Sequence, residues 1–206
     1  MSKTATVERL KSLRLHGMVA AWTDLIAPGE SGIASSKWLI DHLLEAEETD
    51  RAMRSIRHQL SAAKLPIHRD LTGFDFTAAT VDEDLVTRLA TLAFTDTADN
   101  VVLVGGPGTG KTHLATALGF AACSQGKRVR FYTTTGLVTQ LLEAREERTV
   151  QRVLKQLDRQ DLIVLDELGY VPFSKAGAEL LFDVVSRAYE RTSLIVTTNL
   201  PFEQWT

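Results

Sequence analysis

A glycine-rich segment constrains the fold of this chain more than any other feature. Residues 105–112 read Gly-Gly-Pro-Gly-Thr-Gly-Lys-Thr, directly after the apolar run at 101–104 and before a helical pattern. This pattern is typical of a phosphate-binding loop, in which glycines let backbone amides surround an anion at a helix N-terminus. The alternative, a glycine-rich turn without a ligand, is disfavoured by the strand before it and the helix after it. We therefore expect the chain to bind a nucleoside triphosphate.

The residues of this loop have distinct expected roles. Lys111 should reach the β- and γ-phosphates, and the Thr112 hydroxyl should bind Mg²⁺. His113 shares no metal-ligand spacing with the other histidines, so we interpret it as a packing or capping residue. The residues expected to line the nucleotide site are Gly105, Gly106, Pro107, Gly108, Thr109, Gly110, Lys111, Thr112 and His113.

The composition bounds location and partners. The 206-residue chain is 44% hydrophobic and 24% charged, with a formal net charge of −3. No apolar run approaches membrane-spanning length, and the N-terminus lacks the apolar core of a signal peptide. The single cysteine, Cys123, excludes an internal disulfide framework, fits a reducing cytosol and lies in an apolar run typical of a buried thiol. We expect a cytoplasmic protein without a membrane partner, in which any DNA-binding site is a local patch.

Two parts of the chain differ in pattern. From Ser2 to about Leu65, apolar residues recur at the three- and four-residue spacing of helices. Pro and Gly at 28–32 break this pattern, and a second long helix is expected from residue 35 or 36 until Pro66 ends it. We place an N-terminal helical domain at residues 1–68.

The second part alternates between strand and helix patterns. Residues 71–76 form an expected linker that lays aromatic side chains on the following domain, and a helix is expected at 82–94. The expected strands are 101–104, 129–133, 162–166 and 194–198, and the expected helices are 111–124, helices across 135–158, and 175–190. This order predicts an α/β fold, a three-layer P-loop NTPase with a parallel sheet, over residues 69–206.

Polar residues end two of these strands. The apolar run at 162–165 ends in Asp166 and Glu167, and ligands bind at the carboxyl ends of strands in open α/β sheets. Asp166 would hold the Mg²⁺ shell, and Glu167 would orient and deprotonate the attacking water. Asn199 ends the next strand, where it either senses the γ-phosphate or serves as a turn residue before Pro201.

The whole chain resembles the IstB-like transposition helper ATPases, a branch of AAA+ close to DnaC-type helicase loaders. The resemblance rests on residues 100–105 and 110–115, on Leu-Asp-Glu-Leu-Gly-Tyr at 165–170, and on Thr-Thr-Asn-Leu at 197–200. Leu-Arg-Leu-His-Gly-Met at 13–18 is also similar to the opening of this family. The resemblance implies Mg²⁺ and ATP as cofactors, oligomerisation on duplex DNA through the ATPase domain, and recruitment of a transposase. It also favours a sensor role for Asn199.

The chain departs from this family pattern at its end. AAA+ modules of this kind continue with a further strand, an arginine finger and a small helical segment, whereas this sequence stops at Thr206. We expect a truncated ATPase core in which residues 101–104 form an unpaired sheet edge. Arg187 and Arg191 are the arginines best placed to face a neighbouring subunit, although a solvated helix face is the favoured explanation of both.

Two local basic patches are candidates for DNA contact. If the backbone is helical, the residues of the first patch lie on one helix face, but interleaved acids also permit ion pairs within the helix. Its members are Arg145, Arg148, Arg152, Lys155 and Arg159. The other patch has no acid within its span and could track phosphates, or form a solvated face opposite apolar residues. Its members are Arg51, Arg54, Arg57, His58, Lys64, His68 and Arg69.

These observations predict an AAA+ ATPase that assists DNA transposition by assembling on DNA and recruiting a transposase. Its N-terminal helices would contact DNA, a neighbouring subunit or the transposase. A helicase loader would share every ATPase residue and differ only in its protein partner. A nucleotide-gated binding switch with little turnover is the third interpretation.

Overall fold

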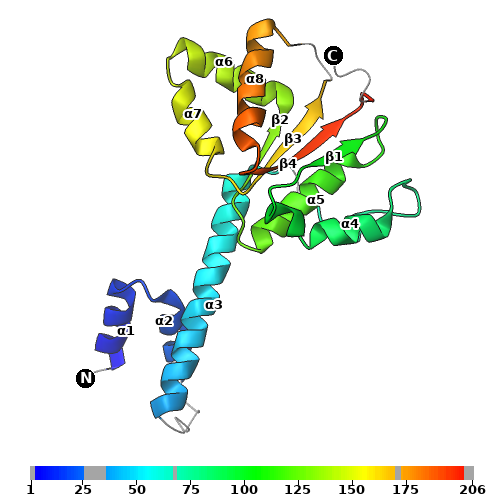
Figure 1. Cartoon of the computed structure of the whole chain (residues 1–206). Coiled ribbons are helices and arrows are strands. Elements are labelled where there is room, and N and C mark those ends of the chain that lie inside the picture. The colour runs from blue at the N-terminus through cyan, green and yellow to red at the C-terminus, as the bar shows by residue number, and fades with distance from the viewer. Residues whose placement is uncertain (1–2, 26–35, 67–68, 170–172, 202–206) are drawn as a thin grey trace. The chain divides into compact units, whose positions relative to one another are not determined.

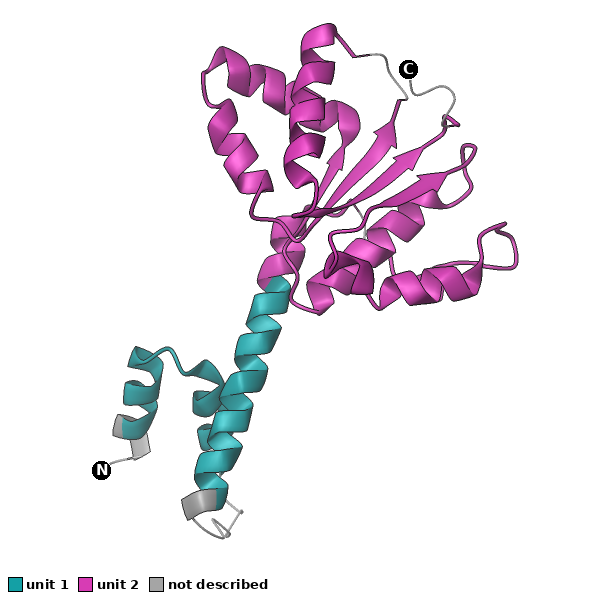
Figure 2. Ribbon diagram, viewed as in Figure 1, with its two compact units in different colours: residues 1–57 teal, residues 58–206 magenta. Residues whose placement is uncertain are grey.

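The computed structural model describes residues 3–25, 36–66, 69–169 and 173–201 of the chain. It divides into two compact units, residues 1–57 and 58–206, which are coloured separately in Figure 2. The division falls inside one long helix, α3 (Ser36–Ala63), which contributes residues to both units. The domain boundary expected after residue 68 stays a prediction.

The N-terminal unit contains α1 (Lys3–Ser12), α2 (His16–Leu25) and the first part of α3. The single helical run expected before residue 28 is therefore wrong, because the chain leaves the helix at Arg14, whose φ is 58°. The amide of Arg14 donates to the Lys11 carbonyl, and the amide of Leu15 donates to the Leu10 carbonyl. This is the Schellman motif, in which an α-helix ends at one residue with left-handed backbone. The break expected at 28–32 lies outside the described residues.

A buried carboxylate joins two helices of this unit. Glu47 on α3 is 4% exposed, and its Oε2 accepts hydrogen bonds from the amides of Gly17 (2.9 Å) and Met18 (3.3 Å) at the start of α2. Burial alone would raise the pKa of Glu47, but hydrogen bonds from Arg51 and these two amides outweigh it and hold the pKa below its ordinary value. Glu47 therefore caps the N-terminus of α2 from a neighbouring helix.

The second unit is built on a four-stranded parallel sheet. The strands are β1 (Val101–Val104), β2 (Val129–Thr133), β3 (Leu162–Leu168) and β4 (Ser193–Thr198), and their order is β1-β4-β3-β2. All three pairings are parallel, which confirms the predicted α/β class. The central strands β3 and β4 are almost wholly apolar and buried, as strands covered on both faces must be.

Helices cover both faces of this sheet (Figure 1). α6 (Thr134–Glu146), α7 (Val150–Leu157) and α8 (Lys175–Ala188) pack on one face against Ile163 and Leu165 of β3. α5 (Lys111–Ser124), with the end of α3, packs on the other face against Leu162 and Val164. Alternate residues of β3 thus pack into two different cores. Each large apolar side chain that is fully buried stabilises the fold by about 1.5–3 kcal/mol. Cys123 lies in the second core, where burial raises its pKa to about 11.

Left-handed residues interrupt the chain in two of the predicted helical regions, 82–94 and 135–158. The helix expected at 82–94 is α4 (Glu83–Ala90), capped by Asp82, and Leu92 with φ 64° separates it from a short 3₁₀ turn at Ala93–Thr95. Arg148 with φ 60° lies between α6 and α7. Periodicity alone does not reveal these turns, because non-glycine residues seldom adopt positive φ.

Strand β1 forms one edge of the sheet, as predicted. Within the described ranges it pairs with β4 alone, and Val102 and Val104 are 37% and 44% exposed. The linker that follows α3 contains a 3₁₀ turn at Leu71–Gly73, which is capped by the Asp70 side chain. No helix in the part of the chain described here is both long and apolar enough to cross a membrane.

Candidate functional site

The loop between β1 and α5 adopts a conformation that requires glycine at two positions. Gly108 and Gly110 have φ of 77° and 87°, values that side-chain-bearing residues rarely adopt. A Cβ on Gly110 would also lie 2.6 Å from the ring of Phe74. The loop leads directly into α5, whose first amides have no acceptor within the helix. The positive end of a fourteen-residue helix therefore faces this loop.

Lys111 is the first residue of α5, and its ammonium folds over the loop. Nζ donates to the carbonyl oxygens of Gly105 and Gly106, each at 2.7 Å. Burial lowers the pKa of Lys111, while the nearby charge of Asp166 opposes this shift. A partly desolvated ammonium at a helix N-terminus is suited to bind an anion.

The Thr112 hydroxyl connects this loop to the end of β3. It lies 2.9 Å and 3.1 Å from the two carboxylate oxygens of Asp166 and donates to them. Asp166 is only 4% exposed, so its charge needs hydrogen bonds and a nearby cation to be tolerated. The contact brings together the two residues that the sequence analysis assigned to Mg²⁺.

A β-bulge carries Asp166 and Glu167. Leu165 pairs with Val196 and Leu168 pairs with Thr198, so both acidic residues lie opposite the single residue Thr197. Glu167 adopts φ 62° at this bulge and its side chain is exposed, whereas that of Asp166 is buried. The bulge thus directs two consecutive carboxylates into different environments.

Asn199 follows β4 at the carboxyl end of the sheet, where β3 ends in the acidic pair. Because the strands are parallel, this places Asn199 at the same edge of the sheet as Glu167. Its side chain is exposed. The neighbouring Thr198 carbonyl accepts a hydrogen bond from the amide of Gly105, which joins the end of β4 to the start of the phosphate-binding loop.

Arg69 reaches this site, although the sequence analysis placed it in a DNA-binding patch. A pocket beside the loop is lined by Arg69, Gly108, Thr109, Gly110, Lys111, Thr112 and His113. Arg69 lies in the segment between α3 and α4, which is held against α5 by two contacts. His113 Nε2 donates to the Asp70 carbonyl at 2.9 Å, and the His113 ring packs edge-on against the ring of Phe74. His113 is thus a packing residue, and the linker lays an aromatic ring on the core as predicted. Spacing along the sequence carries no signal for Arg69, because only the fold of the linker brings it here.

The basic residues of α6 and α7 do not share the single helix face that their spacing predicted. The turn at Arg148 divides them, leaving Arg145 on α6 and Arg152 and Lys155 on α7. All five basic side chains of this patch, including Arg148 and Arg159, are exposed. Among the described residues none of them forms an ion pair within 4.0 Å, so the interleaved acids do not neutralise them.

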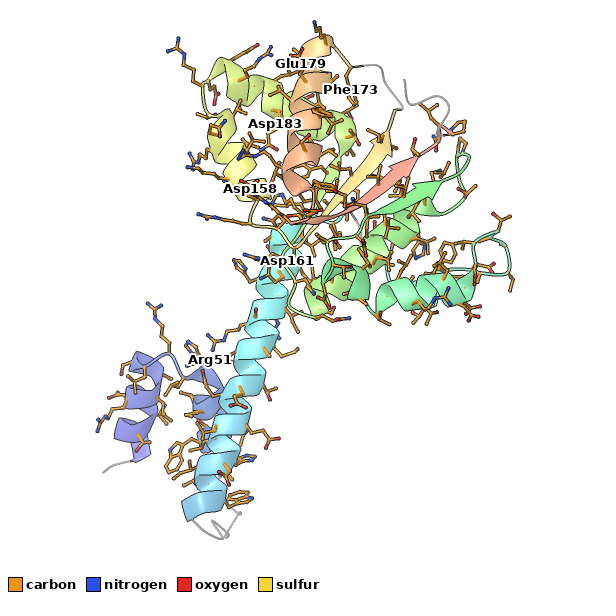
Figure 3. All side chains as sticks on the ribbon, viewed as in Figure 1. Arg51, Asp158, Asp161, Phe173, Glu179 and Asp183 are labelled. Carbon is orange, nitrogen blue, oxygen red and sulfur yellow. The ribbon has the colours of Figure 1, made fainter. Side chains whose placement is uncertain are left out.

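The basic residues of α3 are partly neutralised. Arg51 pairs with Glu47 at 2.7 Å, and Arg54 pairs with Asp50 at 2.7 Å (Figure 3 labels Arg51). These acids precede the span that the sequence analysis considered. Arg57, His58 and Lys64 are exposed, and His68 lies outside the described residues.

Arg187 and Arg191 differ in their surroundings. Arg187 on α8 donates to the carboxylate of Asp158, which follows α7, at 3.2 Å (Figure 3 labels Asp158). Its guanidinium is thus engaged within the chain. Arg191 is exposed beyond the end of α8.

Comparison with known proteins gives a family and a fold. The family described as "IstB-like ATP binding protein" matches residues 8–206. A relative from Pseudomonas aeruginosa, described as an ATP-binding protein of insertion sequence IS21, is 40% identical over 163 residues. The match covers 79% of this chain, and the chain spans 62% of the length of that relative.

Two solved structures share the fold of most of this chain. AMPPCP-bound DnaA from Aquifex aeolicus superposes with a TM-score of 0.62 at 19% identity, over 69% of this chain and 45% of that one. The DnaC helicase loader superposes with a TM-score of 0.52 at 24% identity, over 71% of this chain and 81% of that one. The chain therefore has an α/β P-loop NTPase fold, shared with these two proteins.

Proposed function

This chain belongs to the family of IstB-like ATP-binding proteins, and from that premise we propose that it is an ATPase that assists DNA transposition. In this proposal it binds ATP with Mg²⁺ in the loop between β1 and α5, assembles on duplex DNA through its ATPase domain and recruits a transposase. The insertion-sequence origin of the IS21 relative supports the transposition role. The N-terminal helices, within a domain that we place at residues 1–68, would contact DNA, another subunit or the transposase.

One observation carries the ATP-binding part of this proposal. The Thr112 hydroxyl contacts the buried Asp166 carboxylate beside the Lys111 ammonium and the N-terminus of α5. Lys111 and the loop amides would bind the terminal phosphates, because both present positive charge or hydrogen-bond donors to an anion. In this proposal the site includes the pocket that Arg69 and residues 108–113 line.

The donor set of the site fits a magnesium ion. Thr112 and Asp166 offer hard oxygen donors side by side, and Mg²⁺ is usually held by one or two carboxylates together with phosphate oxygens and water. Among the described residues no group of three or more His, Cys, Asp or Glu side chains could hold a metal ion. Bound magnesium would neutralise charge on the β- and γ-phosphates.

Hydrolysis would use two polar residues, Glu167 and Asn199, at the carboxyl ends of β3 and β4. Glu167 is exposed next to Asp166, where it would orient a water molecule and accept its proton. Asn199 would position the γ-phosphate or that water from the end of β4. An exposed carboxylate at the bulge and an amide at the neighbouring strand end support these roles.

The patch on α6 and α7 is the better candidate for DNA contact. Its cations are exposed without ion-pair partners among the described residues, whereas Arg51 and Arg54 of the α3 patch are paired with Glu47 and Asp50. Free cations gain more from phosphate than paired ones, because no existing interaction has to be broken. Sequence-independent, salt-sensitive binding follows from such contacts.

The test compares DNA affinity and ATP turnover in matched variants. The double variant R152A/K155A should weaken binding to duplex DNA, and should reduce the slope of log affinity against log salt by about 2. The control R88A/K175A removes one exposed arginine from α4 and one exposed lysine from α8. It should change neither the DNA affinity nor the salt slope. Equal losses of DNA affinity in both variants would reject the α6–α7 contact.

ATP turnover is tested separately. Turnover that is stimulated by DNA and lost in E167Q would support the ATPase assignment, whereas ATP binding without turnover would favour a nucleotide-gated binding switch.

A separate experiment distinguishes the transposition helper from a helicase loader. The immobilised 206-residue chain should retain a transposase. Retention of the replicative helicase instead would reject the transposition role, while leaving the ATP site as described.

A further inference from the structure

Thr197 on β4 is a buried hydroxyl at the centre of the site, and no phosphate-loop or acidic motif includes it. It is 1% exposed within a strand whose preceding residues, 194–196, are apolar. A buried hydroxyl in such a strand needs hydrogen-bond partners, because leaving it unpaired is costly. Its two partners are the adjacent acidic residues of β3.

The hydroxyl of Thr197 makes one bond to each acidic residue. It donates to Oδ1 of Asp166 at 2.5 Å and accepts from the backbone amide of Glu167 at 2.9 Å. A hydroxyl carries one donor and two acceptor sites, so both bonds form together. The same side chain therefore sets the orientation of the Asp166 carboxylate and anchors the backbone of Glu167.

The β-bulge explains why one residue can serve two. Asp166 and Glu167 together lie opposite Thr197, and the extra residue leaves an amide that the regular ladder does not pair. Glu167 also adopts a left-handed conformation that is unfavourable for a side-chain-bearing residue. On the other side of β3, the Thr134 hydroxyl donates to the Asp166 carbonyl at 2.8 Å. Hydroxyls from both neighbouring elements thus hold the bulge.

We propose that Thr197 is a positioning residue that aims the Asp166 carboxylate at the metal ion and holds Glu167 at the edge of the sheet. This inference rests on the proposed function, because it assigns Asp166 to Mg²⁺ and Glu167 to the attacking water. With Oδ1 held by Thr197, the carboxylate cannot rotate freely about its side-chain torsion. Its orientation toward Thr112 is therefore fixed before magnesium nucleotide binds.

The test measures how strongly Mg²⁺ enhances ATP affinity. Calorimetry with ATP in magnesium buffer and in EDTA gives the ratio of the two dissociation constants for each variant. T197V keeps the branched shape and removes the hydroxyl, so the ratio should fall about tenfold, the effect of one lost hydrogen bond to a charged group. Affinity in EDTA should stay unchanged. T197S restores the hydroxyl and should restore the ratio.

A matched control separates positioning from a general effect on the fold. Thr116 on α5 is also 1% exposed, but its hydroxyl has no hydrogen-bond partner among the described residues. T116V is therefore the same substitution at an equally buried site and should keep the wild-type ratio. T197A provides a smaller second variant should T197V fail to fold.

The outcomes distinguish this inference from the function on which it rests. A wild-type ratio in either folded variant, T197V or T197A, would overturn the positioning role and leave ATP binding intact. A T197S variant as impaired as T197V would also overturn it, because the hydroxyl would then be irrelevant. Failure of the wild-type chain to bind ATP in magnesium would instead overturn the proposed function, and this inference with it.

Discussion

The Thr112 hydroxyl donates to the Asp166 carboxylate at 2.9 Å, although 54 residues separate them along the chain. Parallel pairing in the sheet order β1-β4-β3-β2 brings the end of β3 close to the loop that follows β1. One residue comes from a phosphate-binding loop and the other from the end of a buried strand, and each supplies oxygen donors of the kind that Mg²⁺ prefers.

Replacing Asp166 with asparagine should selectively reduce the magnesium-dependent part of ATP binding. The amide keeps the size of the side chain and loses the charge, so the gain in affinity that Mg²⁺ provides should fall about tenfold or more. Affinity in EDTA should change little. Calorimetry measures both, and D84N, an exposed residue in the first turn of α4, is the control. An unchanged magnesium effect in D166N would show that the carboxylate holds no metal ion.

Replacing Arg69 with alanine should weaken ATP binding several-fold, by about the strength of one partly exposed contact between a cation and a phosphate. Arg69 lines the pocket beside the loop, whereas Arg57 is an exposed arginine of α3 outside the pocket. Fluorescence titration with a nucleotide analogue measures the effect, with R57A as the control. Equal affinity in R69A and wild type would show that Arg69 does not contact the nucleotide and would leave it in the α3 basic patch.

Replacing Gly17 with alanine should loosen the N-terminal unit without affecting ATP binding. The added Cβ would lie 2.2 Å from the carbonyl oxygen of Ala46, so α2 must move away from α3 and its bonds to Glu47 must lengthen. We expect a loss of about 2 kcal/mol or more in the stability of this unit. Hydrogen exchange of the α2 amides measures it. The comparison in the second unit is G73A, where an added Cβ would meet no heavy atom closer than 3.7 Å. Unchanged protection of α2 would contradict the packing described.

The ion pair between Arg128 and Asp161 should make the free energy of unfolding depend on pH in the acid range. The Arg128 guanidinium donates to both carboxylate oxygens, at 2.6 Å and 3.1 Å, and these bonds hold the pKa of Asp161 below its ordinary value. Because the folded pKa is the lower one, the pair stabilises the fold above about pH 4 and this contribution is lost as the pH falls further. The pair is partly exposed, so D161N should cost only about 1 kcal/mol at neutral pH. Urea unfolding at several pH values should show a shallower acid dependence in D161N than in wild type, and parallel curves would contradict this assignment.

The predictable parts of the fold were those that local pattern determines. Strands 101–104 and 129–133 and the helix 111–124 agree with the structure residue for residue, because apolar runs bounded by glycine or polar residues leave little choice of register. The turns at Arg14, Leu92 and Arg148 were missed, because these residues adopt positive φ without the glycine that usually signals it.

Part of the candidate site was equally hidden. Lys111, Thr112 and Asp166 belong to motifs whose spacing can be read directly. Arg69 and Thr197 reach the site only through the fold, Arg69 through the linker and Thr197 through strand pairing with the bulge. The available signals for Thr197 were its polar side chain after the apolar run 194–196 and its place in the motif at 197–200, but neither assigned it a role.

Every functional role proposed for this chain depends on the loop at 105–112 binding the terminal phosphates of ATP. Calorimetry of the full chain with ATP and magnesium tests it most directly, comparing wild type with K111A and with the control K175A, which removes an exposed lysine of α8. We expect saturable binding by wild type and K175A and at least about tenfold weaker binding by K111A, which lacks the ammonium at the loop. Equal binding by K111A, or no binding by the folded wild-type chain, would show that this loop does not bind the phosphates of ATP.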